Sequence, residues 1–272
     1  YSDSMQIVIG ETVNFVYNNF ENLSNWTIGD SSDTASSGIW EIAIPNPTYN
    51  DEGELIQPDS DHSDIGESCF ITENGTNSNP GNASQSDVDG GKTTLYSPVY
   101  DLSDSQSGIV SYWNWYTNSQ GNNPGTDFWQ VELSDNGGLT WINLEISNQS
   151  NNFWEYKQFL LNDYIDILTN QIQFRFIAED IFNEGDQGSG GSLVEAALDD
   201  FSIDIFVNQE EECPIGDLNQ DNVINVQDIV ILISVVLQLV DIDDILLCLS
   251  DINQDGNVDV LDVVILVNII LN

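Results

Sequence analysis

Two twelve-residue segments near the C-terminus place oxygen-bearing side chains at a spacing that suits a hard metal cation. They are DLNQDNVINVQD, residues 217–228, and DINQDGNVDVLD, residues 251–262. Loop positions 1, 3, 5, 9 and 12 would supply side-chain oxygens, and position 7 a backbone carbonyl. The predicted Ca²⁺ ligands are Asp217, Asn219, Asp221, Val223, Asn225 and Asp228 in the first loop, and Asp251, Asn253, Asp255, Asn257, Asp259 and Asp262 in the second.

Each loop also needs a residue at position 6 that turns the chain sharply. Gly256 holds this position in the second loop and Asn222 in the first, and both residue types tolerate a left-handed backbone. The loops are 34 residues apart, 217 against 251, and an apolar run follows each one. The repetition favours two Ca²⁺ sites over simple Asp/Asn-rich turns. Calcium in turn favours an extracellular, secreted protein that associates with a cell surface or remains free.

The charge of the chain excludes several kinds of partner. It has 46 acidic and three basic residues, for a formal charge of -43. Nucleic acid and anionic membrane surfaces would be repelled, whereas divalent cations would be attracted. The most apolar stretch, residues 229–240, is too short to span a bilayer, so no membrane insertion is expected.

The first 207 residues predict a mainly β fold, an antiparallel β-sandwich of the jelly-roll type. Short runs of β-branched and aromatic residues alternate with clusters of Gly, Asn, Asp and Ser, and helical periodicity is lacking. The predicted strands are residues 6–9, 12–17, 40–44, 68–72, 93–96, 108–116, 127–134, 142–146, 153–159, 172–178 and 195–207.

We expect four segments: an extra N-terminal strand at 1–13, the sandwich at 14–207, a linker at 208–212 and a small α-helical calcium module at 213–272. The module's helices should cover residues 228–240 and 262–272. Both are apolar on most faces, so they should be buried on most faces. About sixty residues cannot bury them alone, which requires the sandwich, a neighbouring subunit or a dedicated partner.

The three cysteines are placed unequally. Cys213 lies four residues before the first loop and Cys248 three before the second, a matched placement that suggests a disulfide between the loop entries. Cys69, in the segment SCFIT, has the pattern of a buried strand residue.

Residues 213–272 resemble a dockerin, a pair of calcium-loop–helix repeats. The resemblance implies docking to a cohesin receptor on an extracellular scaffold. In that family, positions 10 and 11 of each loop commonly contact the cohesin, often through Ser or Thr. Here these positions hold Val226 and Gln227, then Val260 and Leu261. This departure favours an intramolecular or subunit–subunit role for the apolar helix faces.

Several motifs between residues 14 and 205 resemble the MAM-like jelly rolls of secreted bacterial proteins. They are FENLSNW (20–26), DHS (61–63), DVDGGKTTLYSPVYDLS (87–103), SYWNWY (111–116), DNGGLTW (135–141) and AALDDFSI (196–203). The resemblance implies an accessory domain that is not catalytic. It also allows a third Ca²⁺ in the sandwich, at Glu21, Asp61, Asp87, Asp89, Asp199 and Asp200.

Catalytic chemistry has little to rest on, and we expect no enzyme. His62 is the single histidine and sits among carboxylates, where a structural role is favoured over a general base. Zinc ligation would need more His and Cys than the chain has. A glycosidase needs only two carboxylates, but no pair stands out.

Carbohydrate binding is the stronger small-ligand hypothesis, because the chain has seven tryptophans. Trp113 and Trp115 would share one face of a strand, with Tyr112 and Tyr116 on the other. A sandwich core accounts for at least one of these faces, so core packing is favoured over a sugar platform.

Two functions follow. The N-terminal strand could pair with its own sandwich or add to a neighbour's sheet, and the second arrangement would join copies head to tail. The favoured function is therefore a non-catalytic, calcium-stabilised, self-assembling structural or adhesive protein, such as a fibre subunit. The alternative is a carbohydrate-binding accessory module anchored to a cohesin-like scaffold. The expected partners are other copies of the chain or a cohesin, and polysaccharide.

Overall fold

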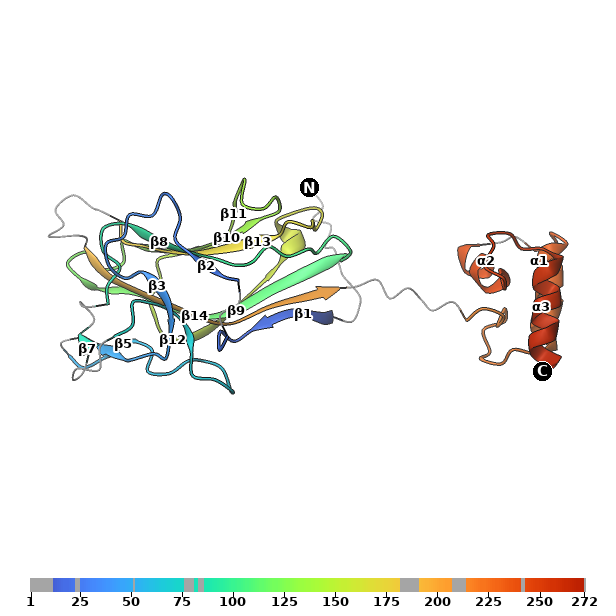
Figure 1. Ribbon diagram of the computed structural model, residues 1–272, viewed down its shortest axis with the longest axis horizontal. Coiled ribbons are helices and arrows are strands. Elements are labelled where there is room, and N and C mark those ends of the chain that lie inside the picture. The colour runs from blue at the N-terminus through green and yellow to red at the C-terminus, as the bar shows by residue number, and fades with distance from the viewer. Residues whose placement is uncertain are drawn as a thin grey trace, which may run out of the picture. The chain divides into compact units, whose positions relative to one another are not determined.

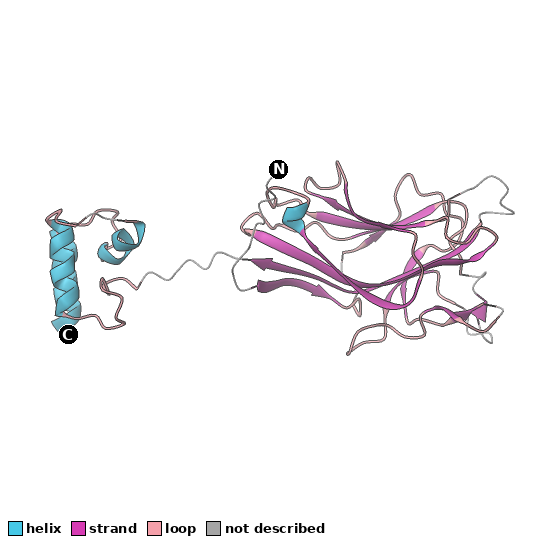
Figure 2. Ribbon diagram, turned by 180° about the vertical axis from the view of Figure 1, so that it is seen from behind, coloured by secondary structure: helices cyan, strands magenta, loops and turns pink. Residues whose placement is uncertain are grey.

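A computed structural model describes residues 12–22, 25–50, 52–75, 81–82, 86–181, 191–206, 214–240 and 243–271. The chain divides into two compact units, Tyr1–Asn208 and Gln209–Asn272, and each is described by itself. All α-helices of the described residues lie in the C-terminal unit, and nearly all strands face one another in two layers of the N-terminal unit (Figures 1 and 2).

The N-terminal unit is an antiparallel two-sheet sandwich. One sheet has the order β12-β9-β14-β6-β3, with β1 also paired to β14, and the other has the order β11-β10-β13-β8-β2. The first sheet comprises β1 (Thr12–Asn18), β3 (Trp40–Ala43), β6 (Cys69–Thr72), β9 (Ser107–Gly121), β12 (Asn151–Leu160) and β14 (Ser192–Phe206). The second comprises β2 (Thr27–Ile28), β8 (Lys92–Tyr96), β10 (Phe128–Ser134), β11 (Ile142–Ser147) and β13 (Gln173–Glu179).

Smaller elements complete this unit. A three-stranded sheet, β5-β4-β7, contains β4 (Thr48–Tyr49), β5 (Leu55–Gln57) and β7 (Gly81–Asn82). A 3₁₀ turn, η2 (Leu161–Asp163), follows β12. These elements lie outside the two main sheets of the sandwich.

Alternation along β9 explains how the sandwich fills its core. Val110, Tyr112 and Tyr116 join the main cluster between the sheets. Trp115 points to the opposite side and packs with Cys69 in a second buried cluster. Residues two apart in a strand share a face, so one strand serves both clusters.

The strand predictions are confirmed wherever the structure describes them, with boundaries that differ by a few residues. The predicted strand at residues 6–9 lies outside the described residues. Thr12 and Val13, from the extra N-terminal segment, belong to β1 and pair antiparallel with Phe206 and Ile205 of β14. This part of the segment therefore adds to the chain's own sheet.

The C-terminal unit is a three-helix module, formed by α1 (Val226–Val236), α2 (Asp244–Ser250) and α3 (Val260–Leu271). The helix expected at residues 228–240 begins at Val226 and ends at Val236, because Gln238 adopts a left-handed φ of 57°. The helix expected at 262–272 begins at Val260. We did not expect α2, whose first turn is capped by Asp243 accepting a hydrogen bond from the N–H of Leu246 at 2.8 Å.

The C-terminal unit by itself does not bury its two apolar helices on most faces, as expected, and the surface that would cover them stays a prediction. A small core unites Leu218, Leu232, Leu249 and Leu266. Each helix nevertheless leaves large apolar side chains in solvent, among them Val230 at 59% exposure. Among the described residues, no helix is long and apolar enough to cross a membrane.

The cysteines follow the prediction in part. Cys69 is a free cysteine at 0% exposure in β6. Cys248 in α2 is disulfide-bonded. Its predicted partner, Cys213, lies outside the described residues, so that pairing stays a prediction.

At Gly38, the loop before β3 lies very close to the segment that leads into β8. Its φ is 66°, and a Cβ there would lie 2.3 Å from Val88 Cα. Gly29 also has a positive φ, 93°, but a Cβ there would meet nothing within 4 Å. A left-handed conformation costs a side chain about 1–2 kcal/mol. We expect Gly29→Ala to lower the free energy of unfolding by that amount. Gly38→Ala should lower it by about 1–3 kcal/mol more, because the new Cβ would displace the backbone at Val88. Urea unfolding followed by tryptophan fluorescence measures both; equal losses would contradict the close approach.

Candidate functional site

The first calcium-type loop is closed by carboxylates that accept backbone hydrogen bonds. At position 1, Asp217 accepts from the N–H groups of Asp221 and Asn222, at 3.1 and 2.7 Å. At position 12, Asp228 accepts from the N–H groups of Asn219 and Asn225, at 3.1 and 2.8 Å. These four bonds tie both ends of the loop to its middle.

The second loop repeats this arrangement at equivalent atoms. Asp251 accepts from the N–H groups of Asp255 and Gly256, at 3.1 and 2.8 Å. Asp262 accepts from the N–H groups of Asn253 and Asp259, at 3.2 and 2.8 Å. Each distance agrees with its counterpart in the first loop to within 0.1 Å, so the sequence repeat is also a structural repeat.

Position 6 turns the chain as the sequence requires. Asn222 has φ 64° and Gly256 has φ 85°, both in the left-handed region. At position 9, Asn225 and Asp259 accept the N–H two residues later, at 2.8 and 2.7 Å, where α1 and α3 begin. Each loop is thus continuous with the helix it precedes.

The donor set of the loops fits a hard cation. The predicted ligands are carboxylate, amide and backbone oxygens, without nitrogen or sulfur, which is the chemistry that Ca²⁺ selects. The position-12 carboxylates, Asp228 and Asp262, are fully buried although charged side chains are seldom buried without a partner. Across the described residues, no group of three or more His, Cys, Asp or Glu side chains is arranged to hold a metal ion. The loop carboxylates instead accept hydrogen bonds from backbone N–H groups.

The six acidic residues considered for a third Ca²⁺ fall into two separate groups. The first contains Glu21, Asp61, Asp199 and Asp200. Glu21 accepts from the N–H groups of Glu67 and Ser68, at 2.8 and 2.7 Å. Burial raises the pKa of Asp61, and the charges of Glu21 and Asp200 raise it further. The third Ca²⁺ stays a prediction.

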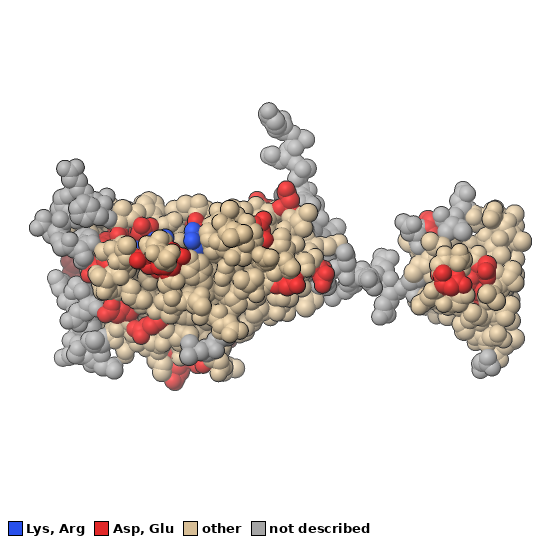
Figure 3. All heavy atoms as spheres, turned by 45° about the horizontal axis from the view of Figure 1, so that its top comes forward, with Lys and Arg blue, Asp and Glu red and all other residues tan. Residues whose placement is uncertain are grey.

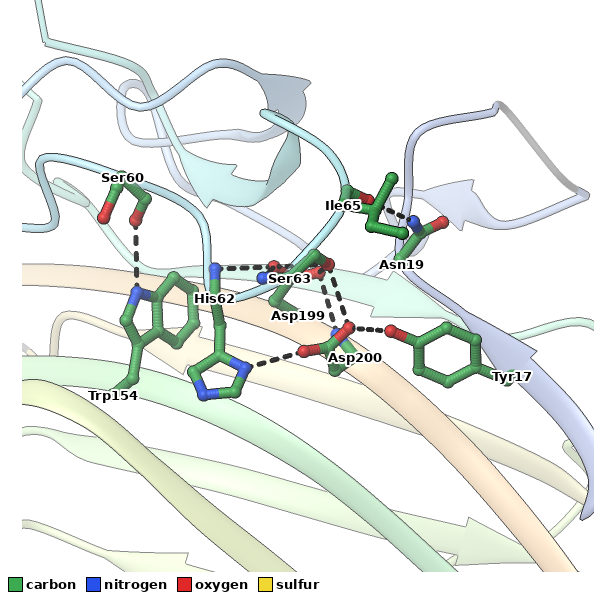
Figure 4. Close-up of polar contacts among 9 residues, drawn as sticks. All are labelled: Tyr17, Asn19, Ser60, His62, Ser63, Ile65, Trp154, Asp199 and Asp200. Atoms are coloured by element: carbon green, nitrogen blue, oxygen red, sulfur yellow. Dashed lines mark hydrogen bonds and ion pairs between the residues drawn. The ribbon is translucent and has the colours of Figure 1, made fainter.

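His62 belongs to this first group and fastens a loop to β14 (Figure 4). Its Nδ1 lies 2.6 Å from Asp200 Oδ2, and its backbone N–H donates to Asp199 Oδ2 at 2.8 Å. The ring stacks on Trp113, with centroids 3.7 Å apart. Asp200 also accepts from the hydroxyl groups of Ser63 and Tyr17, the latter on β1. These contacts give His62 a structural task.

The second group surrounds Asp87 and Asp89 and includes Asp127, Asp180 and Glu195. Burial raises the pKa of Asp87 to about 8 and that of Asp180 to about 6, and neighbouring carboxylates add to both shifts. Burial also raises the pKa of Glu195 well above its ordinary range. Asp87 accepts from the N–H of Val194 at 2.5 Å, which joins the segment before β8 to β14.

None of the seven tryptophans, all of which the structure describes, is an exposed platform. Trp40, Trp115 and Trp129 are buried, and Trp141 lies under Arg175, whose guanidinium carbon is 4.3 Å from the ring centroid. Core packing therefore accounts for most of the aromatic content, as expected.

A site that the sequence did not single out lies between the edge strands β11 and β12. Side chains of β9 and β12 from one sheet and β10 and β11 from the other line a cleft of about 350 Å³. One signal was readable: on β9, Asn114 continues the core-facing series of Val110 and Tyr112, where an apolar residue is the rule. The remaining lining comes from strands far apart in the chain.

Each calcium-type loop is followed by apolar side chains that are exposed to solvent. Val226 is 65% exposed, and Val260 and Leu261 are 64% and 58% exposed. Val226 is at position 10 of the first loop, and Val260 and Leu261 are at positions 10 and 11 of the second; we call this set of exposed apolar residues the loop-exit surface. Its apolar character matches the departure from Ser or Thr noted in the sequence.

Comparison with known families matches residues 215–271 to the family "Dockerin type I domain". The C-terminal unit is thus a three-helix dockerin module. Comparison with curated protein sequences gives no match.

Solved structures similar to the sandwich include modules that bind sugars and adhesin domains. One is a family 61 carbohydrate-binding module in complex with β-1,4-galactotriose, with 13% identity and a TM-score of 0.38, covering 67% of this chain and 90% of the other. Another is the K1 adhesin domain of Lys-gingipain from Porphyromonas gingivalis, with 16% identity and a TM-score of 0.36, covering 73% and 99%. A third is the C-terminal family 22 carbohydrate-binding module of Clostridium thermocellum Xyn10B, with 10% identity and a TM-score of 0.37, covering 72% and 95%. The MAM-like resemblance stays a prediction.

The raised pKa values predict that the sandwich loses stability as pH rises in a chelator. The pKa is raised to about 6 for Asp180, about 7 for Asp199 and about 8 for Asp87, chiefly by burial, against an ordinary 3.8. The folded state therefore binds these protons more tightly than the unfolded state. The resulting stabilisation is complete below pH 3.8 and is lost as pH rises through 6 to 8. One pKa unit corresponds to about 1.4 kcal/mol, so we expect a fall of at least that size between pH 5 and 8.5.

Urea unfolding followed by tryptophan fluorescence measures this fall in the sandwich alone, because all seven tryptophans lie between residues 26 and 154. Asp87→Asn should flatten the pH dependence, whereas Asp101→Asn, at an exposed carboxyl with a lowered pKa, should not. A stability that rises over this range would contradict the burial of protonated carboxyls. A third Ca²⁺ in the sandwich would be revealed by calcium restoring the lost stability at pH 8.5.

Proposed function

We propose that this chain is an extracellular, non-catalytic accessory protein. Its dockerin module attaches it to a cohesin in a calcium-dependent way, and its β-sandwich is a carbohydrate-binding cargo. The observation that carries the docking part is the pair of superimposable oxygen-lined loops within the dockerin match. The C-terminal unit offers the attachment and the N-terminal unit the cargo.

Calcium would set the geometry of the attachment. The proposed calcium loops lie immediately before the helices whose first turns carry the loop-exit surface. The unit's own apolar core is small, and only Leu218, Leu232, Leu249, Leu266 and Val235 are buried apolar residues among those described. Binding free energy from the ions would therefore contribute directly to folding.

A cohesin surface complementary to this module should be apolar. Such a contact would cover Val226, Val260 and Leu261, and removing their apolar surface from water would contribute to binding. Serine or threonine at these positions would instead donate and accept hydrogen bonds. The proposed partner is thus a cohesin that lacks a polar contact at the matching place.

The docking proposal also bears on the fibre-subunit hypothesis. A dockerin module supplies attachment through a separate receptor, and the described part of the N-terminal strand, Thr12–Asn18, pairs with the chain's own β14. Both observations favour the accessory-module alternative over head-to-tail self-assembly. The cleft between β11 and β12 supports a carbohydrate-binding role for the sandwich.

Removing a position-1 carboxylate should remove one Ca²⁺ site. We expect Asp217→Ala and Asp251→Ala each to lower the calcium stoichiometry of the full chain by one in isothermal titration calorimetry, because each carboxylate serves a single loop. The variants control for each other. Chelation should also reduce the helical circular dichroism signal, since all described α-helices lie in the C-terminal unit. Unchanged stoichiometry in both variants would contradict the ligand assignment.

Charging the loop-exit surface should abolish docking. The double variant Val226→Asp, Val260→Asp places a carboxylate in each repeat of a proposed apolar contact, so both copies of the surface are disrupted. Burying such charges unpaired is costly, and we expect at least a hundredfold loss of affinity, about 2.7 kcal/mol. Surface plasmon resonance against a panel of purified type I cohesins in calcium measures this. Ile65→Asp, at an 84% exposed apolar residue of the sandwich, should bind normally. Equal binding by the double variant would place the contact elsewhere.

A further inference from the structure

We infer that the cleft between β11 and β12 is the ligand site of the sandwich and that its ligand is a neutral saccharide. This inference rests on the carbohydrate-binding role proposed above and adds the place and the chemistry of recognition. The cleft opens where the edge strands of the two sheets meet, so its walls come from both sheets. Polar side chains stand there at positions that elsewhere in the sandwich face the core.

The floor of the cleft holds acceptors that lack donors. Asn114, only 3% exposed, and Asn151 each have a buried amide oxygen without a hydrogen-bond partner among the described residues. An unpaired buried acceptor costs about 1–3 kcal/mol. A ligand bearing hydroxyl groups would supply donors and relieve this cost.

A network of fixed charges forms one wall. Glu145 Oε2 accepts from the Tyr112 hydroxyl at 2.7 Å and from Trp129 Nε1 at 3.1 Å. Lys157 Nζ lies 3.3 Å from Glu145 Oε1 and 2.8 Å from Glu155 Oε2. Each side chain is thus held by at least one other, so the wall is organised before a ligand arrives.

Lys157 in this wall keeps its charge at neutral pH. Burial lowers the pKa of Lys157, but the hydrogen bond to Glu155 and the charges of Glu145 and Glu155 outweigh it and raise the pKa. Asn151 Nδ2 donates to Glu155 Oε2 at 2.9 Å, which joins the wall to the unpaired amide on the floor. Lysine donors and carboxylate acceptors lie side by side, as hydroxyl groups that both donate and accept require.

An aromatic ring stands at the mouth of the cleft. Phe153 lines it and is 65% exposed. On β12 the cleft-lining residues are alternate ones, 151, 153, 155 and 157. Tyr156 therefore points to the other side of the sheet, where it contacts Trp113 at 5.4 Å between centroids. An exposed ring beside hydrogen-bonding groups offers a face for the apolar side of a sugar ring.

The balance of groups selects the ligand class. Two carboxylates and one ammonium give the wall a net charge of -1, which disfavours anionic ligands. The unpaired amide oxygens disfavour a purely apolar ligand. A neutral polyhydroxylated ring satisfies the acceptors, the ammonium and the aromatic face together.

Affinity electrophoresis of the full chain in calcium tests this inference. The gels would contain xylan, β-1,4-galactan or mixed-linkage β-glucan as neutral probes, and polygalacturonate as a charged one. We expect retention by at least one neutral polysaccharide and none by polygalacturonate. Stronger retention by polygalacturonate would overturn the neutral class. Retention by no polysaccharide would overturn the carbohydrate-binding role of the sandwich itself, while leaving calcium-dependent docking to its own test.

Two cleft variants and one matched control locate the site. Phe153→Ala should weaken retention at least tenfold because the stacking ring is lost, whereas Tyr156→Ala, at an exposed aromatic residue of the same strand, should not. Asn114→Leu should also abolish retention, yet leave the melting temperature unchanged or higher, because it removes an unpaired buried acceptor at similar volume. Wild-type retention that survives both cleft variants would overturn the site and leave the carbohydrate-binding role standing. A lowered melting temperature for Asn114→Leu would mean that Asn114 stabilises the fold. The inference would then depend on Phe153→Ala, and normal retention of that variant by the polysaccharide would overturn it.

Discussion

The structure must accommodate many carboxylates with almost no basic side chains to pair with them. The sequence has 46 acidic residues and three basic ones. On the face shown in Figure 3, acidic side chains are spread over the sandwich and basic atoms form one small group. Backbone N–H groups take the place of cations: Glu21, Asp87, Asp199, Asp217 and Asp251 all accept hydrogen bonds from them. Where the carboxyl is ionised, such bonds are charge-assisted and strong, and they fix carboxylate-bearing loops that would otherwise repel one another.

The two units use the same bond with different consequences. In the sandwich, several of these carboxyls are buried, so their pKa values rise and the proton itself becomes part of the structure. In the dockerin module, carboxylates gather in two short loops beside a minimal apolar core. This explains why α1 and α3 can leave apolar faces in solvent: we propose that the loops and their ions, more than the core, hold the helices.

Elements that depend on a local residue pattern could be predicted from the sequence. Long strands such as β9 and β14 could be predicted because runs rich in aromatic and β-branched residues stand between clusters of turn-forming residues. The strands β2, β4, β5 and β7 have only two or three residues, which is too few for a period. β2 and β7 depend on pairing with strands distant in the chain, and β4 and β5 pair across a short turn. The apolar pattern of α1 and α3 shows which faces avoid water but not which surface covers them, so that surface stays a prediction. The cleft was not predicted, because its lining comes from four strands, β9, β10, β11 and β12, that are brought together only by the fold. The polar Asn114 at a core-facing position of β9 was the one local sign of it.

The scarcity of cations makes the position of Lys157 informative. Arg175 is held by Glu132 and lies over Trp141, a closed contact on one sheet. Lys157 instead bridges Glu145 on β11 and Glu155 on β12, across the opening between the sheets. A bridge that served only to close this edge would favour apolar neighbours, because those strengthen an ion pair without leaving acceptors unpaired. Asn114 and Asn151 do the reverse, and stability alone would select against them. Their presence beside a fixed ion-pair network fits a ligand that supplies the missing donors.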